Sequence, residues 1–290
     1  MFAILFIFGV AIGSFINVLS LRYDEEKNKI LFTSAIQGRS RCRDCAKVLC
    51  WYELIPLVSY GIQCGTCRGC KKPLLWQYPL IELATGLLTA SLPIFLYQHL
   101  HGAQLTAQGL SLVWVYIAIG LWLLAVYTAI TLAAIDLRLK IIPDQANILL
   151  ALIGVILVAI KKFGLLDYAN FSGSYATMLG APANPIFAAL IAAGFALALF
   201  GGIVYLTKER GMGLGDVKLA IPLALILGWP DALIAFSSSF VIGSLVGLLL
   251  IAKRKATMKH ALPFGPFLII GLFVAVFWSE TILRWYFGLI

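Results

Sequence analysis

Long apolar runs separated by short polar stretches are the feature that most constrains this chain. A helix needs about 20 mainly apolar residues to cross a bilayer core, and inside lipid its backbone groups must be satisfied internally. Only 12% of the residues are charged, whereas soluble domains carry about 25%. The sequence therefore predicts an all-α polytopic membrane protein with about eight transmembrane helices. The predicted spans are 1–20, 78–98, 111–135, 146–166, 184–206, 217–229, 231–251 and 264–287.

The sixth predicted span, 217–229, is short and contains Pro222. It is either a full crossing or a half-helix in a re-entrant pair. Both alternatives return the basic cluster Lys253-Arg254-Lys255 to the same side of the membrane as the other basic segments.

The positive charges indicate the orientation. Of the 22 Lys and Arg residues, 19 lie in four segments, and basic residues concentrate in cytosolic loops. We therefore expect both termini on the periplasmic side, and we attribute the net charge of +9 to topology, with no nucleic acid as partner. The run Met1–Leu21 has no basic residue before it, so it is expected to be a retained helix and not a signal peptide. The four segments are 22–77, 136–145, 207–218 and 252–262.

The large polar segment 22–77 holds all six cysteines. Cys42-x2-Cys45 and Cys67-x2-Cys70 have the spacing of a four-thiolate zinc site. Two disulfides are the alternative, which a cytosolic location disfavours because thiols are kept reduced there. We expect a cytosolic zinc-ribbon-like insertion between the first two helices, structural or substrate-docking in role.

Two cysteines are surplus to this site. Cys64-x2-Cys67 is also a C-x2-C pair, so spacing alone leaves the second knuckle ambiguous. Cys50 and Cys64 are interpreted as free thiols near the metal. The nearby Lys47, Lys71 and Lys72 are expected to soften the thiolate charge.

Three acids lie at membrane boundaries near apolar runs: Glu82, Asp136 and Asp216, with Asp144 on a short loop nearby. Acids at bilayer depth are costly and usually functional. Asp136 ends an apolar helix, where the macrodipole disfavours negative charge, so a structural role is hard to supply. Asp216 ends Gly213-Leu214-Gly215-Asp216, a turn that can present a carboxylate, with a helix N-cap as the alternative. Asp144, after Pro143, is expected to be an N-cap.

Asp136 and Asp216 at the same depth suggest an aspartyl protease. Like charges sharing a site do not both ionise easily. One carboxylate then activates water as general base, while the protonated partner polarises the scissile carbonyl. No metal is needed for this chemistry, and no G-x-S-x-G nucleophile motif is present.

The motifs together resemble the bacterial type 4 prepilin peptidases, a family of G-x-G-D-type membrane aspartyl proteases. The resemblance spans nearly the whole chain in the right order. It is carried by Gly13-Ser14-Phe15-Ile16-Asn17-Val18 followed by Arg22, the two C-x2-C pairs 21 residues apart with Trp51-Tyr52-Glu53-Leu54-Ile55-Pro56 between them, Tyr78-Pro79-Leu80-Ile81-Glu82, Asp136 with Ile142-Pro143-Asp144, Gly211 to Lys218, and Pro263-Phe264-Gly265-Pro266-Phe267.

The resemblance implies a bifunctional enzyme of the bacterial inner membrane with its active site facing the cytosol. It would cleave the leader of type IV prepilins or type II secretion pseudopilins after a glycine, with Asp136 and Asp216 catalytic by motif position. It would then methylate the new N-terminal amine using S-adenosylmethionine. The whole chain, 1–290, would be the membrane-embedded peptidase, with the cysteine insertion at 22–77 and the protease site in the bundle 78–290.

The methyl-donor site is not evident from the sequence. No glycine-rich nucleotide loop after a strand is present, so a Rossmann-type methyltransferase is not expected. Asn17, Arg22, Glu82 and Lys218 are weak candidates to line the site, or they are paired interface residues. The family often has a proline soon after this arginine, whereas Tyr23-Asp24 follows Arg22 here. This departure leaves the protease residues untouched and counts slightly against the implied methyl transfer.

Two rival functions follow from the same acids. One is a peptidase of the same chemistry with another substrate, such as preflagellin or a presenilin-type substrate, which the cysteine segment disfavours. The other is a transporter whose aspartates relay protons; it would be expected to show paired broken helices in two halves, which the sequence does not show clearly.

Overall fold

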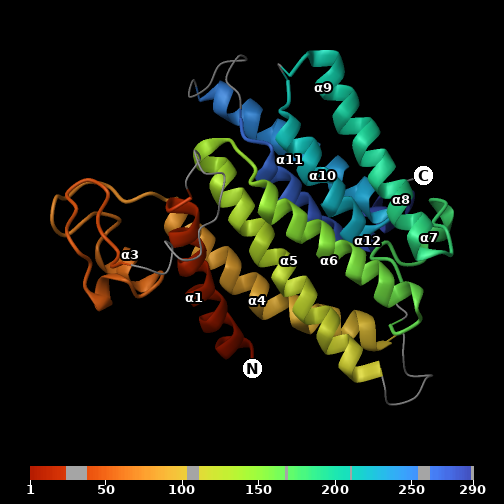
Figure 1. Ribbon diagram of the computed structural model, residues 1–290, viewed down its shortest axis with the longest axis horizontal. Coiled ribbons are helices and arrows are strands. Elements are labelled where there is room, and N and C mark those ends of the chain that lie inside the picture. Colours follow the sequence, from red (N-terminus) through yellow and green to blue (C-terminus); the bar gives the residue numbers. More distant parts are fainter. Residues whose placement is uncertain (24–37, 103–110, 167–168, 210, 254–261, 289–290) are drawn as a thin grey trace. The chain divides into compact units, whose positions relative to one another are not determined.

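The computed structural model describes residues 1–23, 38–102, 111–166, 169–209, 211–253 and 262–288. The regular elements in these ranges are all helices (Figure 1). Isolated β-bridges join Arg41 to Val48 and Thr66 to Pro73, and these ranges contain no β-strand. The chain forms two compact units, Met1–Ile94 (unit 1) and Phe95–Ile290 (unit 2). The helices are α1 (Phe2–Leu21), η1 (Trp51–Glu53), α3 (Val58–Ile62), α4 (Gln77–Gly102), α5 (Ser111–Leu139), α6 (Asp144–Lys162), α7 (Tyr175–Met178), α8 (Pro185–Ala196), η2 (Leu197–Gly201), α9 (Gly202–Thr207), α10 (Leu214–Leu227), α11 (Asp231–Ala252) and α12 (Gly265–Gly288).

Seven helices in the described residues are long and apolar enough to cross a membrane, which confirms the all-α membrane fold. The fifth of them is continuous through α8, the π-helical η2 and α9. The seven spans are Phe2–Leu21, Gln77–Leu100, Leu112–Leu139, Asp144–Lys162, Pro185–Thr207, Asp231–Ala252 and Gly265–Gly288.

The remaining predicted span is α10, whose 14 residues extend about 21 Å, less than the bilayer core of about 30 Å. Its first turn lies beside the start of α6, where Lys218 Nζ is 2.9 Å from Asp144 Oδ1. Just beyond its last turn, the Trp229 N–H donates to the Ala188 carbonyl at the start of α8 (3.1 Å). Although short, α10 therefore runs from one end of unit 2 to the other.

Glycines allow α1 and α4 to pack closely in unit 1. A Cβ on Gly13 would lie 2.8 Å from the Glu82 Cα, so only hydrogen fits between the two backbones. Small residues at helix contacts are the usual way for membrane helices to approach one another. One turn further along α1, Asn17 Nδ2 donates to the Tyr78 carbonyl at the start of α4 (3.2 Å).

In unit 2, α5, α6, α10 and α12 pack against one another, and α11 packs along α12 (Figure 1). Four of these helices meet at one end, where α5 finishes and α6, α10 and α12 begin. The opposite end is fixed by Asp231, which is fully buried at the start of α11. Its two carboxylate oxygens accept the backbone N–H groups of Phe171 and Ser172, both at 2.8 Å.

Substituting Asp231→Asn is expected to destabilise the protein, because an amide offers only one acceptor oxygen and turns a donor toward the second N–H. Leaving a buried group unsatisfied costs about 1–3 kcal/mol. The measurement is the thermal unfolding midpoint of the purified protein in detergent.

The matched control is Asp144→Asn, which breaks an exposed ion pair with Lys218 of the kind that contributes about 0–1 kcal/mol. Equal shifts for the two variants would contradict a structural role for Asp231.

Candidate active site and cysteine cluster

Asp136 lies in the last turn of α5 and is 4% exposed. Its Oδ2 accepts the backbone N–H of Gly265, the first residue of α12, at 3.0 Å. The C-terminus of α5 disfavours a negative charge, whereas the N-terminus of α12 offers a free N–H and the positive end of its dipole. A structural contact for Asp136, which was hard to supply from the sequence, is therefore provided by the start of α12.

Gly265 permits this contact because it has no side chain. A Cβ at this position would lie 2.6 Å from the Asp136 Oδ2. Gly265 was not predicted from the sequence as a site residue. Its place in the motif Pro263 to Phe267, between two prolines and two phenylalanines, is the sequence feature that could have indicated such a role.

Asp216 is half-buried in the first turn of α10. Gly213 is the N-cap and Asp216 the third helical residue, so the N-cap alternative for Asp216 is wrong. The backbone N–H of Gly213 interacts with its carboxylate, and helix N-termini favour such charges.

The charge of Asp216 also acts on Asp136. The structure thus brings the two acids predicted to be catalytic into electrostatic contact, one from the end of α5 and one from the start of α10.

Asp144 has a different role from the one expected of it, and Lys218 has one of the two that were expected. Pro143 is the N-cap of α6, and Asp144 is its first residue without a side-chain cap bond, so the predicted N-cap is wrong. Asp144 and Lys218 form an exposed ion pair at 2.9 Å that ties α6 to α10. Lys218 therefore fits the alternative of a paired interface residue.

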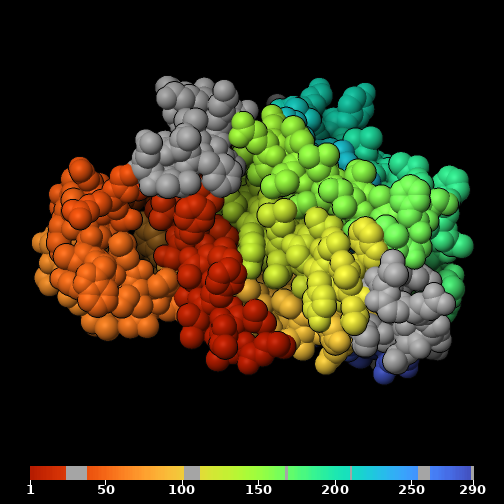
Figure 2. Space-filling model, turned by 60° about the horizontal axis from the view of Figure 1, so that its bottom comes forward, coloured from red at the N-terminus to blue at the C-terminus, as the bar shows by residue number. Residues whose placement is uncertain are grey.

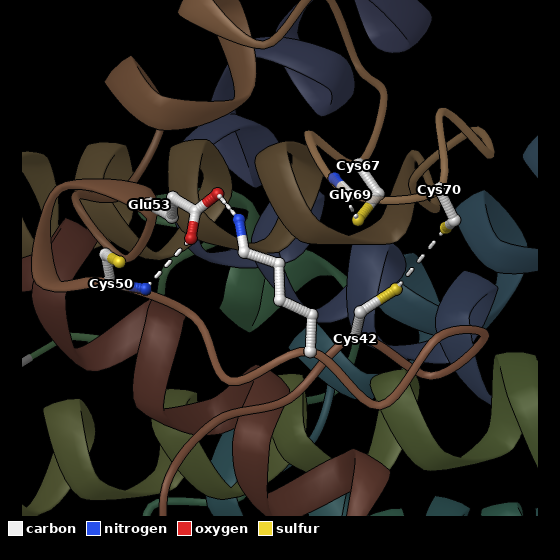
Figure 3. Close-up of polar contacts among 7 residues, drawn as sticks. Cys42, Cys50, Glu53, Cys67, Gly69 and Cys70 are labelled. Carbon is white, nitrogen blue, oxygen red and sulfur yellow. Dashed lines mark hydrogen bonds and ion pairs between the residues drawn. The ribbon is translucent and has the colours of Figure 1, made fainter.

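In unit 1, the thiols of Cys42, Cys45, Cys67 and Cys70 form one cluster, with all four sulfur atoms within 4.8 Å of one another. The Cys42 and Cys70 sulfurs are 3.9 Å apart (Figure 3). Tetrahedral zinc with bonds of about 2.3 Å requires sulfur–sulfur distances of about 3.8 Å, so the cluster fits such an ion. All six cysteines are free thiols, against the disulfide alternative.

The backbone resolves which cysteines form the second knuckle. In the first knuckle, Cys42 N–H donates to the Lys47 carbonyl (2.9 Å), and in the second Cys67 N–H donates to the Lys72 carbonyl (2.9 Å). The two loops thus repeat the same turn. Cys64 lies outside it and is exposed.

Two lysines near the cluster bind carboxylates, and Lys72 also interacts electrostatically with the thiols of Cys70 and Cys42, as expected of a residue that softens their charge. Lys47 Nζ pairs with Glu53 Oε1 at 3.0 Å (Figure 3), and Lys72 Nζ pairs with Asp44 Oδ1 at 2.7 Å. Backbone N–H groups of Cys70 and Gly69 take that role for Cys67, and they lower the pKa of its thiol to about 6. Main-chain dipoles thus favour the thiolate that a metal requires.

Of the four candidate methyl-donor residues, Asn17 and Glu82 line one cavity in unit 1. Arg22 instead reaches the Gly38 carbonyl (3.5 Å) and is not among the lining residues. Tyr60 and Tyr78, which sequence reasoning did not propose as site residues, also line the cavity.

The fold and these two sites define a multi-pass helical membrane protein with a pair of interacting aspartates and a four-cysteine cluster. Residues 7–96 match the family model of the bacterial peptidase A24 N-terminal domain, and residues 123–248 match that of the type IV leader peptidase family. The chain belongs to the type IV leader peptidase family.

Relatives match along nearly their whole lengths. A prepilin leader peptidase/N-methyltransferase of Aeromonas hydrophila is 30% identical over 98% of this chain and 93% of its own length. A protein of the same name from Bacillus subtilis (strain 168) is 30% identical, over 99% of this chain and 98% of its own length. A third, from Legionella pneumophila, is 28% identical over 99% of this chain and 95% of its own length. No solved structure matches the chain.

Substituting Gly265→Ala is expected to destabilise the protein by about 1–3 kcal/mol, the usual cost of an added methyl group in a packed site. The Asp136 side chain or the start of α12 must move to admit it. Thermal unfolding in detergent measures the effect. Gly120→Ala in α5 is the control, since a Cβ there meets open space and alanine favours the helix. An unfolding midpoint for Gly265→Ala at or above that of the parent protein would contradict the contact.

Proposed function

We propose that this chain cleaves the leader of type IV prepilins or type II secretion pseudopilins and methylates the new N-terminal amine. The observation that carries the peptidase half is that Asp136 is buried and lies within electrostatic range of Asp216. Full-length similarity to proteins named prepilin leader peptidase/N-methyltransferase supports both halves.

Asp136 and Asp216 are the proposed catalytic dyad. One carboxylate, ionised, removes a proton from water, and the water oxygen attacks the scissile carbonyl. The other, protonated, donates to the carbonyl oxygen and stabilises its developing charge. The C–N bond then breaks as the first carboxyl group passes the proton taken from water to the departing amine, and the second carboxylate recovers its proton from the new acid. The Gly265 N–H holds one oxygen of Asp136, which would orient the second oxygen toward water and substrate.

The proposed location is the bacterial inner membrane, with the dyad at the cytosolic face and both termini in the periplasm. The concentration of Lys and Arg in four segments supports this orientation. A prepilin has a charged leader before an apolar helix, so its scissile bond would lie at the same interface. The basic insertion 22–77 would orient the leader, and the bundle 78–290 would carry the protease site.

Zinc is the proposed resident metal of Cys42, Cys45, Cys67 and Cys70, in a structural role. The sulfur separations of the cluster support it. A segment this short and polar gains much of its folding free energy from a bound metal. S-adenosylmethionine is the proposed methyl donor and supplies an electrophilic methyl group when bound.

Asp136→Asn and Asp216→Asn are each expected to reduce leader cleavage at least about 100-fold, because general acid–base groups contribute factors of this order or more. Each variant is co-expressed with a prepilin, and mass spectrometry of the pilin N-terminus reports cleavage and the added methyl group. Asp144→Asn is the control and retains cleavage. Full cleavage by either dyad variant would remove that residue from the mechanism.

Metal analysis of the purified chain is expected to find about one zinc per molecule, as a site of four cysteine thiolates holds one ion. Cys67→Ser should lose it, whereas Cys64→Ser should keep it, although both residues belong to a C-x2-C pair. Loss of zinc from Cys64→Ser with retention in Cys67→Ser would reverse the knuckle assignment. A metal-free parent chain would overturn the zinc proposal.

A further inference from the structure

Unit 1 contains a cavity of about 510 Å³, within the range of about 300–1,000 Å³ for small-molecule sites. Its walls come from α1, from the start of α4 and from the cysteine segment, which forms the lobe beside α1 in Figure 2. All its lining residues lie between Ser14 and Glu82 and belong to unit 1, whereas Asp136 and Asp216 belong to unit 2.

Asn17 is one of the residues that line this cavity. The side chain is 3% exposed, and its Nδ2 donates to the Tyr78 carbonyl, which fixes the orientation of the amide. The Oδ1 is buried and has no hydrogen-bond partner among the described residues. A buried acceptor of this kind normally has a donor, which a ligand in the cavity would supply.

Glu82 presents a second acceptor. It is 7% exposed, and its Oε2 accepts the Leu57 N–H at 2.7 Å, with the Ser14 hydroxyl also donating to it. No cation of the described residues pairs with it, although buried charges are normally paired. The residue that it holds, Leu57, has a left-handed φ of 60°, a conformation that costs energy and clusters at ligand sites.

The remaining wall is mixed: Arg41, Arg43, Asp44 and Glu53 contribute charges, and one part of it suits a flat heterocycle. Tyr60 and Tyr78 line the cavity together with aliphatic side chains such as Leu54 and Leu74. Tyr60 is braced by Trp76, with ring centroids 5.8 Å apart. Aromatic rings of this kind bind other rings in stacked or edge-on contact.

We infer that this cavity binds S-adenosylmethionine, with Glu82 and the Asn17 Oδ1 holding its positively charged amino-acid and sulfonium part and the tyrosines contacting its purine. The inference rests on the proposed methyl transfer and gives that half its own site. In the transfer, the pilin amine attacks the methyl carbon with its lone pair. The carbon–sulfur bond breaks with its electrons staying on sulfur, and the methylated amine then releases a proton to solvent.

The test is equilibrium binding of radiolabelled S-adenosylmethionine to the full chain purified in detergent. Glu82→Gln keeps an oxygen for the Leu57 N–H but removes the charge, and Asn17→Ala removes the unpartnered oxygen. Each is expected to weaken binding at least about tenfold, as loss of a charge-assisted hydrogen bond does. Glu280→Gln is the control, because Glu280 is exposed on α12 and pairs with Arg284.

Ultraviolet cross-linking of the labelled donor to the unaltered protein, followed by peptide mapping, locates the site without a substitution. Label is expected in peptides that contain Tyr60 or Tyr78. Label confined to unit 2, or unchanged binding by both variants, would overturn the site while leaving methyl transfer in place.

Two further outcomes separate the remaining alternatives. Competition by a peptide with the mature pilin N-terminus, but not by S-adenosylhomocysteine, would make the cavity an acceptor site and overturn the inference. Absence of both donor binding and pilin methylation in the parent protein would remove the proposed methyl transfer itself, and the inference with it.

Discussion

The hydrogen bond from the Gly265 N–H to Asp136 joins two helix ends whose charges would otherwise be unfavourable. A carboxylate in the last turn of α5 meets the negative end of that helix, and the first N–H groups of α12 have no partner within their own helix. The Gly265 N–H donates to the Asp136 Oδ2 at 3.0 Å, although the two residues are 129 positions apart in the sequence. Near a membrane boundary this pairing matters more than in water, because neither group has free access to solvent.

The same end of unit 2 collects the starts of α6, α10 and α12 around the end of α5. Asp216 lies in the first turn of α10. This short helix is held at both ends. At its start Lys218 forms an ion pair with Asp144, and just beyond its end the Trp229 N–H donates to the Ala188 carbonyl. Asp231 fixes the far end through two backbone N–H groups. Two acids of this unit thus form an interacting pair, while a third holds the far end of the helices together.

Unit 1 joins a segment with a four-cysteine cluster to a pair of closely packed helices. The two knuckles repeat one turn, and the segment between them supplies the N–H of Leu57 that holds Glu82. Cys67 is among the residues that line the cavity, together with Asn17 and Glu82. The cysteine segment therefore supplies both the four-thiol cluster and part of the cavity wall.

The sequence by itself determined the all-α membrane fold, since long apolar runs with few charges have no other stable arrangement in lipid. Cysteine spacing and the two acidic motifs also identified the residues that the structure brings together: four thiols in one cluster and Asp136 in electrostatic contact with Asp216. These signals are local, because each motif sits on a few consecutive residues.

Tertiary structure decided what depends on contacts between distant segments. It selected Cys70 over Cys64 through the repeated turn, gave Asp136 its partner in Gly265, and moved Asp144 from a cap to an ion pair with Lys218. It also joined Asn17 and Glu82 in one cavity. Composition and spacing do not carry such pairings, because they arise only when helices far apart in the sequence pack side by side.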